Sequence, residues 1–255
     1  MSESKPIICV SFGGGTNSTA MLIGLQERGI RPDFITFADT GGERPHTYAH
    51  IKDMQKWLAK VSFPKIVTVK KVDYNGDILT LEENCLQKKM LPSLAYGFKS
   101  CSQKYKIAPQ DKYFNNLDAT KLEFKAGRKV VKFIGYDAGE SRRVKDYSCK
   151  KYDCQYPLVE WGWEREDCVE AIERAGLPQP SKSSCFFCPA NKTNEIREMN
   201  AIYPELIQRA IKMEKNAELT SVKGLGRNFA WSSVIATSDM FPDSYIDVAC
   251  GCYDG

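Results

Sequence analysis

The sequence predicts an α/β protein built on a doubly wound parallel sheet. Short apolar segments recur along the first half of the chain, each ends at polar residues or glycines, and each is followed by apolar residues at helical spacing. Strands that alternate with helices in this way form a parallel sheet with helices on both faces. Such sheets bind ligands beyond the carboxyl ends of their strands, so we expect the functional residues at that edge.

The first strand is expected over residues 6–12, an apolar run that ends at glycines. A helix should follow, with the polar side chains of residues 17–19 as caps and Gly29 at its carboxyl end. Residues 33–39 read Asp-Phe-Ile-Thr-Phe-Ala-Asp and predict the second strand. The chain therefore opens with a strand, a helix and a strand.

The same unit repeats further along the chain. Apolar residues at helical spacing predict a helix over residues 46–60, and a third strand follows over residues 65–69. After a helical stretch over residues 78–90 and a basic, polar segment around Cys101, residues 129–134 read Lys-Val-Val-Lys-Phe-Ile and predict a fourth strand. This alternation is the basis of the fold prediction.

The amino-acid composition changes near residue 147, where cysteines, aromatic residues and prolines become frequent. We expect a small cysteine-rich C-terminal subdomain there, packed over the ligand site. Helices are expected within it over residues 165–175 and 193–219, because their apolar residues recur at helical spacing.

Composition narrows the class of protein. The chain has 255 residues, 42% hydrophobic and 27% charged, with a net charge of +4. No apolar run approaches the ~18–20 residues that a membrane-spanning helix needs, and the start lacks the pattern of a signal peptide. We therefore expect a cytoplasmic protein with no membrane partner. The mild charge does not by itself identify a nucleic-acid-binding protein.

The turn between the first strand and the first helix predicts an anion site. Backbone N–H groups at a helix N-terminus attract anions, and glycines let phosphate oxygens come close to the backbone. An ordinary glycine-rich turn is the alternative for a motif this short. The expected binding residues are Ser11, Gly13, Gly14, Gly15, Thr16, Asn17 and Ser18.

This turn resembles the PP-loop motif S-G-G-x-D-S, with Gly13 in place of the first serine and Asn17 in place of the aspartate. Later segments resemble, in the same order, the motifs of the phosphoadenylyl-sulfate (PAPS) reductase family. They read F-A-D-T-G at 37–41, K-S-C-S-Q-K-Y-K-I-A-P at 99–109, G-Y-D-A-G-E-S at 135–141, P-L-V-E-W at 157–161, G-L-P at 176–178 and C-F-F-C-P at 185–189.

The resemblance implies an adenine nucleotide alpha hydrolase-like fold that binds ATP or a related adenine nucleotide. With the change in composition near residue 147, we expect a PP-loop nucleotide-binding α/β domain over residues 1–146 and a cysteine-containing C-terminal region over residues 147–255, packed over the site. The resemblance also implies that Asp39, Thr40 and Gly41 border the adenosine, and that Gly135 and Glu140 take part in nucleotide binding.

The chain departs from the family motifs at three places. Ser102 replaces a second cysteine, and Asp137 replaces the arginine of a G-x-R motif. The tail reads Ala-Cys-Gly-Cys-Tyr at 249–253, where the reductases carry Glu-Cys-Gly-Leu-His. These departures, with a loop close to the ATP-type pattern, favour ATP or another adenine nucleotide as the ligand.

Arg142 and Arg143 follow the fourth strand at the ligand edge and are candidate catalytic residues. A forked guanidinium can grip phosphate or sulfate through paired hydrogen bonds. A solvated basic turn is the alternative. Lys104 and Lys106 are weaker candidates, because lysines in a surface loop are usually only solvated.

Cys185 and Cys188 form a C-x-x-C pair that can chelate a metal, and the family resemblance brings Cys101 alongside. Three thiolates suit Zn²⁺ or a [4Fe–4S] cluster, and a thioredoxin-like dithiol is the competing use of the spacing. The fourth ligand is open. Its candidates are Cys149, Cys154, Cys250 and Cys252.

The remaining cysteines and the two histidines have simpler interpretations. Cys9 and Cys85 lie in apolar or helical contexts and are expected in the core, as is Cys168 in its amphipathic helix. His46 and His50 lie one helical turn apart, as metal ligands can, but without a nearby carboxylate motif we expect exposed helix residues.

Three functions follow from these observations. In the first, the protein binds ATP with Mg²⁺ and acts at the α-phosphate, adenylating an acceptor with release of pyrophosphate. In the second, it is a genuine PAPS reductase in which Cys250 is the nucleophile. In the third, it is a non-catalytic nucleotide-binding subunit. The acceptor is open: a nucleic-acid base, a sulfate or a protein partner all fit, and we expect a homo-oligomer.

Overall fold

The computed structural model describes residues 5–92, 94–95, 98–144 and 149–240 of the chain. At its centre is a sheet of five parallel strands in the order β3-β2-β1-β6-β7. The strands are β1 (Ile8–Phe12), β2 (Phe34–Asp39), β3 (Ile66–Lys70), β6 (Val130–Ile134) and β7 (Tyr152–Gln155).

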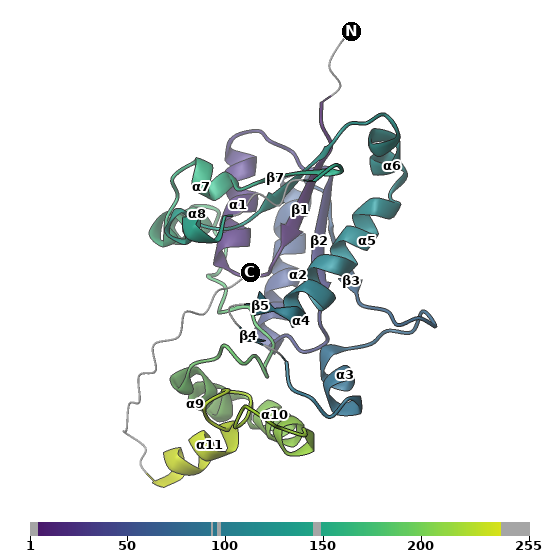
Figure 1. The fold of residues 1–255 in the computed structure, drawn as a ribbon. Helices are drawn as coiled ribbons and strands as arrows, with labels where there is room; N and C mark the ends of the chain where they lie inside the picture. The colour runs from purple at the N-terminus through teal and green to yellow at the C-terminus, as the bar shows by residue number, and fades with distance from the viewer. Residues whose placement is uncertain (1–4, 93, 96–97, 145–148, 241–255) are drawn as a thin grey trace.

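Helices cover both faces of this sheet (Figure 1). Alternate residues of β1 point to opposite faces, as the two-residue repeat of a strand requires. Ile8, Val10 and Phe12 join a core with α1 (Thr16–Glu27), α2 (Pro45–Lys60) and α8 (Arg165–Arg174). Cys9 joins the other core, under α5 (Ala108–Asn116) and α6 (Asp118–Lys125). The predicted α/β fold with a doubly wound parallel sheet is therefore confirmed.

A group of helices lies beyond the carboxyl ends of the strands (Figure 1). Its core contains α3 (Leu81–Gln87), α9 (Thr193–Ile202), α10 (Pro204–Asn216) and α11 (Trp231–Met240), together with the C-x-x-C segment. The backbone joins this group to the sheet directly, because Phe186 N donates to Gly42 O at 2.8 Å, just after β2. The cysteine segment is thereby fixed at the ligand edge.

The remaining elements are short. A two-stranded antiparallel pair precedes a run of helical turns around Cys101, in which a π-helix is inserted. These elements are β4 (Leu94–Ala95), β5 (Phe98–Lys99), α4 (Ser100–Ser102), the π-helix η1 (Gln103–Ile107), the 3₁₀ helix η2 (Ala138–Arg143) and α7 (Pro157–Glu160). Within the described ranges, no helix is both long and apolar enough to cross a membrane.

Several element predictions are refined by the structure. The helix predicted over residues 193–219 is two helices, because the ring of Pro204 cannot continue the hydrogen-bond ladder of α9 and instead begins α10. The edge strand β7 was not predicted, since Tyr-Asp-Cys-Gln is no apolar run. The domain division at residue 146 stays a prediction, although β7 and α8, which lie beyond it, belong to the layers of the sheet.

Candidate nucleotide site

The glycine-rich turn lies at the point where the sheet reverses its winding. β1 pairs with β2 on one side and with β6 on the other, and the chain crosses from β3 to β6 through α5 and α6 on the opposite face, so the winding changes direction between β1 and β6. Gly14 has a φ of +78°, a backbone conformation that favours glycine. A Cβ there would also lie 3.1 Å from Cγ2 of Thr47. Position 14 therefore accommodates glycine and little else.

The N-terminus of α1 carries no side-chain cap. Its N-cap residue is Gly15, and its first turn contains no acidic residue. The capping role predicted for residues 17–19 is wrong, because Ser18 Oγ and Thr19 Oγ1 donate backwards to Gly15 O at 3.1 and 2.9 Å. Gly29 follows the end of the helix with a φ of +65°, as predicted. An uncapped helix start with buried polar residues around it is suited to an anion.

The loop after β6 passes very close to this helix start. A Cβ on Gly135 would lie 3.0 Å from Ser18 Cα and 3.1 Å from Ser18 N. Only a residue without a side chain lets the two loops approach this closely. Gly135 and Ser18, predicted to share one site, do lie side by side.

Asn17 does not face an empty pocket. Its amide nitrogen Nδ2 donates to Asp137 Oδ2 at 2.9 Å and to Glu140 Oε2 at 3.0 Å. Its oxygen Oδ1 accepts from Arg165 Nη1 at 3.1 Å. Asn17 therefore joins α1, η2 and α8 in one hydrogen-bonded network. Sequence reasoning did not select Arg165, which lies 148 residues from Asn17.

The two predicted arginines differ in their surroundings. Arg143 Nη1 contacts Glu140 Oε1 at 2.5 Å, and its guanidinium lies 4.2 Å from the ring centroid of Tyr136. Arg142 is exposed. Arg143 is thus held by the network around Asn17, while Arg142, its neighbour on η2, is exposed to solvent.

The strand tip predicted to border adenosine is held by its own hydrogen bonds. Asp39 is buried, and its Oδ1 accepts from Gly41 N and from the hydroxyl of Tyr48, both at 2.8 Å. Lys70 Nζ lies 3.2 Å from Asp39 Oδ2. Thr40 Oγ1 lies 3.0 Å from Cys185 Sγ. The same turn therefore contacts both the sheet edge and the cysteine segment.

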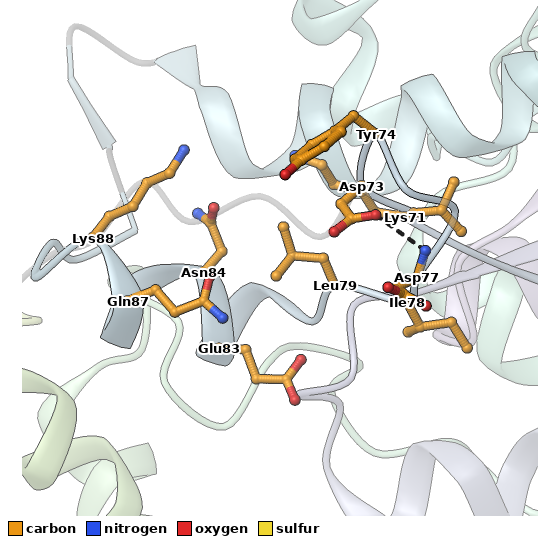
Figure 2. A pocket seen from close by; sticks show the side chains of 11 residues that line it. Lys71, Asp73, Tyr74, Asp77, Ile78, Leu79, Glu83, Asn84, Gln87 and Lys88 are labelled. Carbon is orange, nitrogen blue, oxygen red and sulfur yellow. Dashed lines mark hydrogen bonds between the residues drawn. The ribbon is translucent and has the colours of Figure 1, made fainter.

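A groove of about 740 Å³ lies beside this turn, between the loop that follows β3 and helix α3 (Figure 2). The backbone of α3 is joined to the turn, since Leu81 N donates to Thr40 O at 2.9 Å. The side chains in Figure 2 carry charges of both signs, from Lys71 and Lys88 to Asp77 and Glu83. The lining therefore does not indicate one class of charged ligand.

The three predicted metal ligands enter one apolar cluster beyond the sheet. Cys185 is buried in it, and Cys101 and Cys188 pack against it. Burial and the neighbouring Glu43 carboxylate raise the pKa of the Cys185 thiol well above its ordinary value, and Lys106 opposes this. In the part of the chain that the structure describes, no three His, Cys, Asp or Glu side chains are arranged to hold a metal ion. The metal centre stays a prediction.

The structure separates the candidates for a fourth ligand. Cys149 is exposed, and Cys154 packs on the opposite core with Cys9. Cys250 and Cys252 lie outside the described residues. Cys250 is also the residue predicted as the nucleophile of a PAPS reductase, so the structure does not place that nucleophile. Cys85 is buried, as predicted, but it lies in the same cluster as Cys101. Cys85 was not among the candidate metal ligands predicted from the sequence.

Two further predictions are wrong because buried polar groups leave no periodic signal. His50 is buried rather than exposed, with Nε2 at 2.8 Å from Thr19 Oγ1, and burial lowers its pKa. Lys106 is not a solvated lysine, since its Nζ lies 3.1 Å from Oε1 of Glu43, whose side chain is 0% exposed. Cys168 is buried under α1, as predicted.

No protein-family model and no curated protein matches this chain. Among solved structures, the fold is similar to that of the U34-tRNA thiolase NcsA from Methanococcus maripaludis with its [4Fe-4S] cluster. The two chains are 13% identical, the alignment covers 98% of this chain and 76% of that chain, and the TM-score is 0.45. This likeness concerns the course of the chain alone, and no family assignment follows from it.

Proposed function

We propose that the protein binds ATP, or a related adenine nucleotide, with its phosphates at the start of α1, and cleaves it at the α-phosphate with release of pyrophosphate. The observation that carries the proposal is the uncapped N-terminus of α1 at the switch point of the sheet, entered through Gly14 in a conformation that favours glycine. The backbone amides and the helix dipole there would hold the polyphosphate before and during transfer.

The neighbouring side chains fit distinct tasks in this reaction. Arg142 is exposed on η2, the element whose Glu140 contacts Asn17, and it is the cation proposed to stabilise charge that develops on the transferred phosphoryl group. Asp137 and Glu140 place carboxylates next to the loop, through Asn17, and carboxylates with phosphate oxygens are the surroundings that Mg²⁺ prefers. Arg143 fixes Glu140 rather than the nucleotide.

Replacement of Gly14 tests the proposal. Gly14→Asp places a side chain against Thr47 and a negative charge at the helix start, so we expect loss of ATP binding by calorimetry and loss of pyrophosphate release. Gly127→Asp is the matched control, because Gly127 has a similar φ of +71° but nothing within 4 Å of its Cβ position. Equal ATP affinity in the two variants would refute the proposed site.

Pyrophosphate release also separates the proposed enzyme from a non-catalytic binding subunit. The enzyme should release pyrophosphate from ATP when it is given its acceptor, whereas a binding subunit should bind ATP with full affinity and release none.

A further inference from the structure

A buried cation lies close to the phosphate loop, outside the residues assigned so far. Arg44 precedes α2 and is 7% exposed. Its Nη2 donates to Asn191 Oδ1 at 3.0 Å, while its Nε has no partner. Within residues 5–92, 94–95, 98–144 and 149–240, no carboxylate forms an ion pair with it. A guanidinium keeps its charge in proteins, and a buried charge without a counter-ion is costly.

The adjacent carboxylate does not supply that counter-ion. Glu43 forms its ion pair with Lys106, at 3.1 Å, on the side of the cysteine segment. Its second oxygen has no partner and lies beyond ion-pair distance of Arg44. The positive charge of Arg44 is therefore unbalanced by the described side chains.

Two other buried polar atoms near Arg44 also lack partners. They are Thr47 Oγ1 and Asn191 Nδ2, in residues that are 1% and 3% exposed. Together with Arg44 Nε they make three groups that can donate a hydrogen bond and have no acceptor. Unpaired buried donors are rare in folded proteins and call for an explanation. An oxyanion would supply an acceptor for such donors and would balance the charge of Arg44.

These groups are linked to the phosphate loop from two sides, through Thr47 and through Ser183. Thr47 N donates to Arg44 O at 3.0 Å, and Thr47 Cγ2 packs on Gly14. On the other side, Ser184 Oγ donates to Asn191 Oδ1 at 3.5 Å. The preceding residue, Ser183, lies against Gly14 and Gly15.

We propose that Arg44, Asn191 and Thr47 form an oxyanion subsite beside the phosphate loop. Its ligand is a tetrahedral oxyanion, which is either a terminal phosphate of the nucleotide or a separate sulfate or phosphate. Only the first source rests on the proposed function. The second does not require that a nucleotide binds at all.

Calorimetry with four probes, namely ATP, AMP, inorganic pyrophosphate and inorganic sulfate, distinguishes the two sources. If the ligand is a terminal phosphate, Arg44→Gln should weaken ATP and pyrophosphate at least tenfold and leave AMP unchanged, as expected for loss of a charge-assisted hydrogen bond. If the ligand is a separate oxyanion, sulfate binding should be lost while ATP and AMP keep their affinities. Arg31→Gln, at an exposed arginine that donates to Ser62 O, should change none of them.

Asn191→Asp keeps the test decisive even if Arg44→Gln fails to fold. The new carboxylate would stand where Oδ1 already accepts from Arg44 and would act as an internal counter-ion. The melting temperature should stay equal or rise, while oxyanion affinity falls at least tenfold.

Unchanged affinity for all four probes in a folded Asn191→Asp or Arg44→Gln variant would overturn the subsite. So would a wild-type protein that binds neither pyrophosphate nor sulfate. A wild-type protein that binds sulfate or pyrophosphate through Arg44 but no ATP would support the subsite and refute the nucleotide site alone.

Discussion

Asn17 Nδ2 donates to Asp137 Oδ2 over 2.9 Å, which joins one substituted position of the phosphate-loop motif to the substituted position of the G-x-R motif. An aspartate at position 17 would face the carboxylates of both Asp137 and Glu140. The side-chain amide of Asn17 can donate to both carboxylates, which a carboxylate at this position could not do. The two departures are therefore one coupled feature of the structure.

The coupling predicts the outcome of an exchange. Asn17→Asp should lower the free energy of unfolding by about 1–3 kcal/mol, because it turns a buried hydrogen bond into carboxylate repulsion. The double variant Asn17→Asp with Asp137→Asn again pairs one amide with one carboxylate. It should therefore regain most of the unfolding free energy, and most of any ATP affinity, that Asn17→Asp loses. Urea unfolding and calorimetry measure both. Additive losses in the double variant would show that the residues are not coupled.

The buried ion pair between Lys106 and Glu43 should respond to the loss of one partner. Lys106→Met leaves the Glu43 carboxylate buried without a cation, which should cost about 3–5 kcal/mol of unfolding free energy. Adding Glu43→Gln should restore much of that loss. Lys104→Met is the control, since Lys104 is exposed two residues away. If Lys106→Met and Lys104→Met lowered the unfolding free energy by similar small amounts, the predicted stabilisation by the Lys106–Glu43 ion pair would be wrong.

The cysteine cluster predicts which thiols a metal requires. Protein purified without oxygen should contain zinc, or iron and sulfide with a broad visible absorption, and Cys185→Ser should lose this metal. Cys154→Ser should retain it, because Cys154 packs on the opposite core. Metal analysis and absorption spectra provide the readout. Full metal content in Cys185→Ser would exclude the predicted centre.

His50 predicts a pH dependence of stability. Burial lowers its pKa below the ~6.5 of an unfolded histidine, so the unfolded state takes up a proton first as the pH falls. Stability should therefore decrease below about pH 6.5, with a slope of up to about 1.4 kcal/mol per pH unit. His50→Gln should remove this component and His46→Gln should not. The free energy of unfolding measured between pH 7.5 and 5 decides it; parallel profiles for wild type and His50→Gln would contradict the prediction.

The fold was predictable because its signals are local. An apolar run, the glycines that end it and the helical spacing that follows all lie within a few residues of one another, as in Ile8–Phe12 and the helix after it. The glycine-rich turn was found for the same reason. The boundaries of the predicted strands shifted by one or two residues, and the helix predicted over residues 78–90 is shorter by three residues at each end, at Leu81–Gln87.

The polar network was not predictable in this way. Arg165 lies 148 residues from Asn17, and Asn191 lies 147 residues from Arg44. Neither pair produces a recognisable pattern in the sequence, because a single contact between residues far apart in the chain does not repeat at a regular interval. The π-helix at Gln103–Ile107 adds a further difficulty, because it turns Lys106 toward Glu43 in a segment that looks like a basic surface loop.

Ser183 packs on Gly15, and only one residue separates it from Cys185. An extended chain advances by at most about 3.6 Å per residue, so the backbone positions of Ser183 and Cys185 are at most about 7 Å apart. The glycine turn and the thiol of Cys185 thus contact one three-residue segment of backbone. A shift of this segment would change the surroundings of both at once.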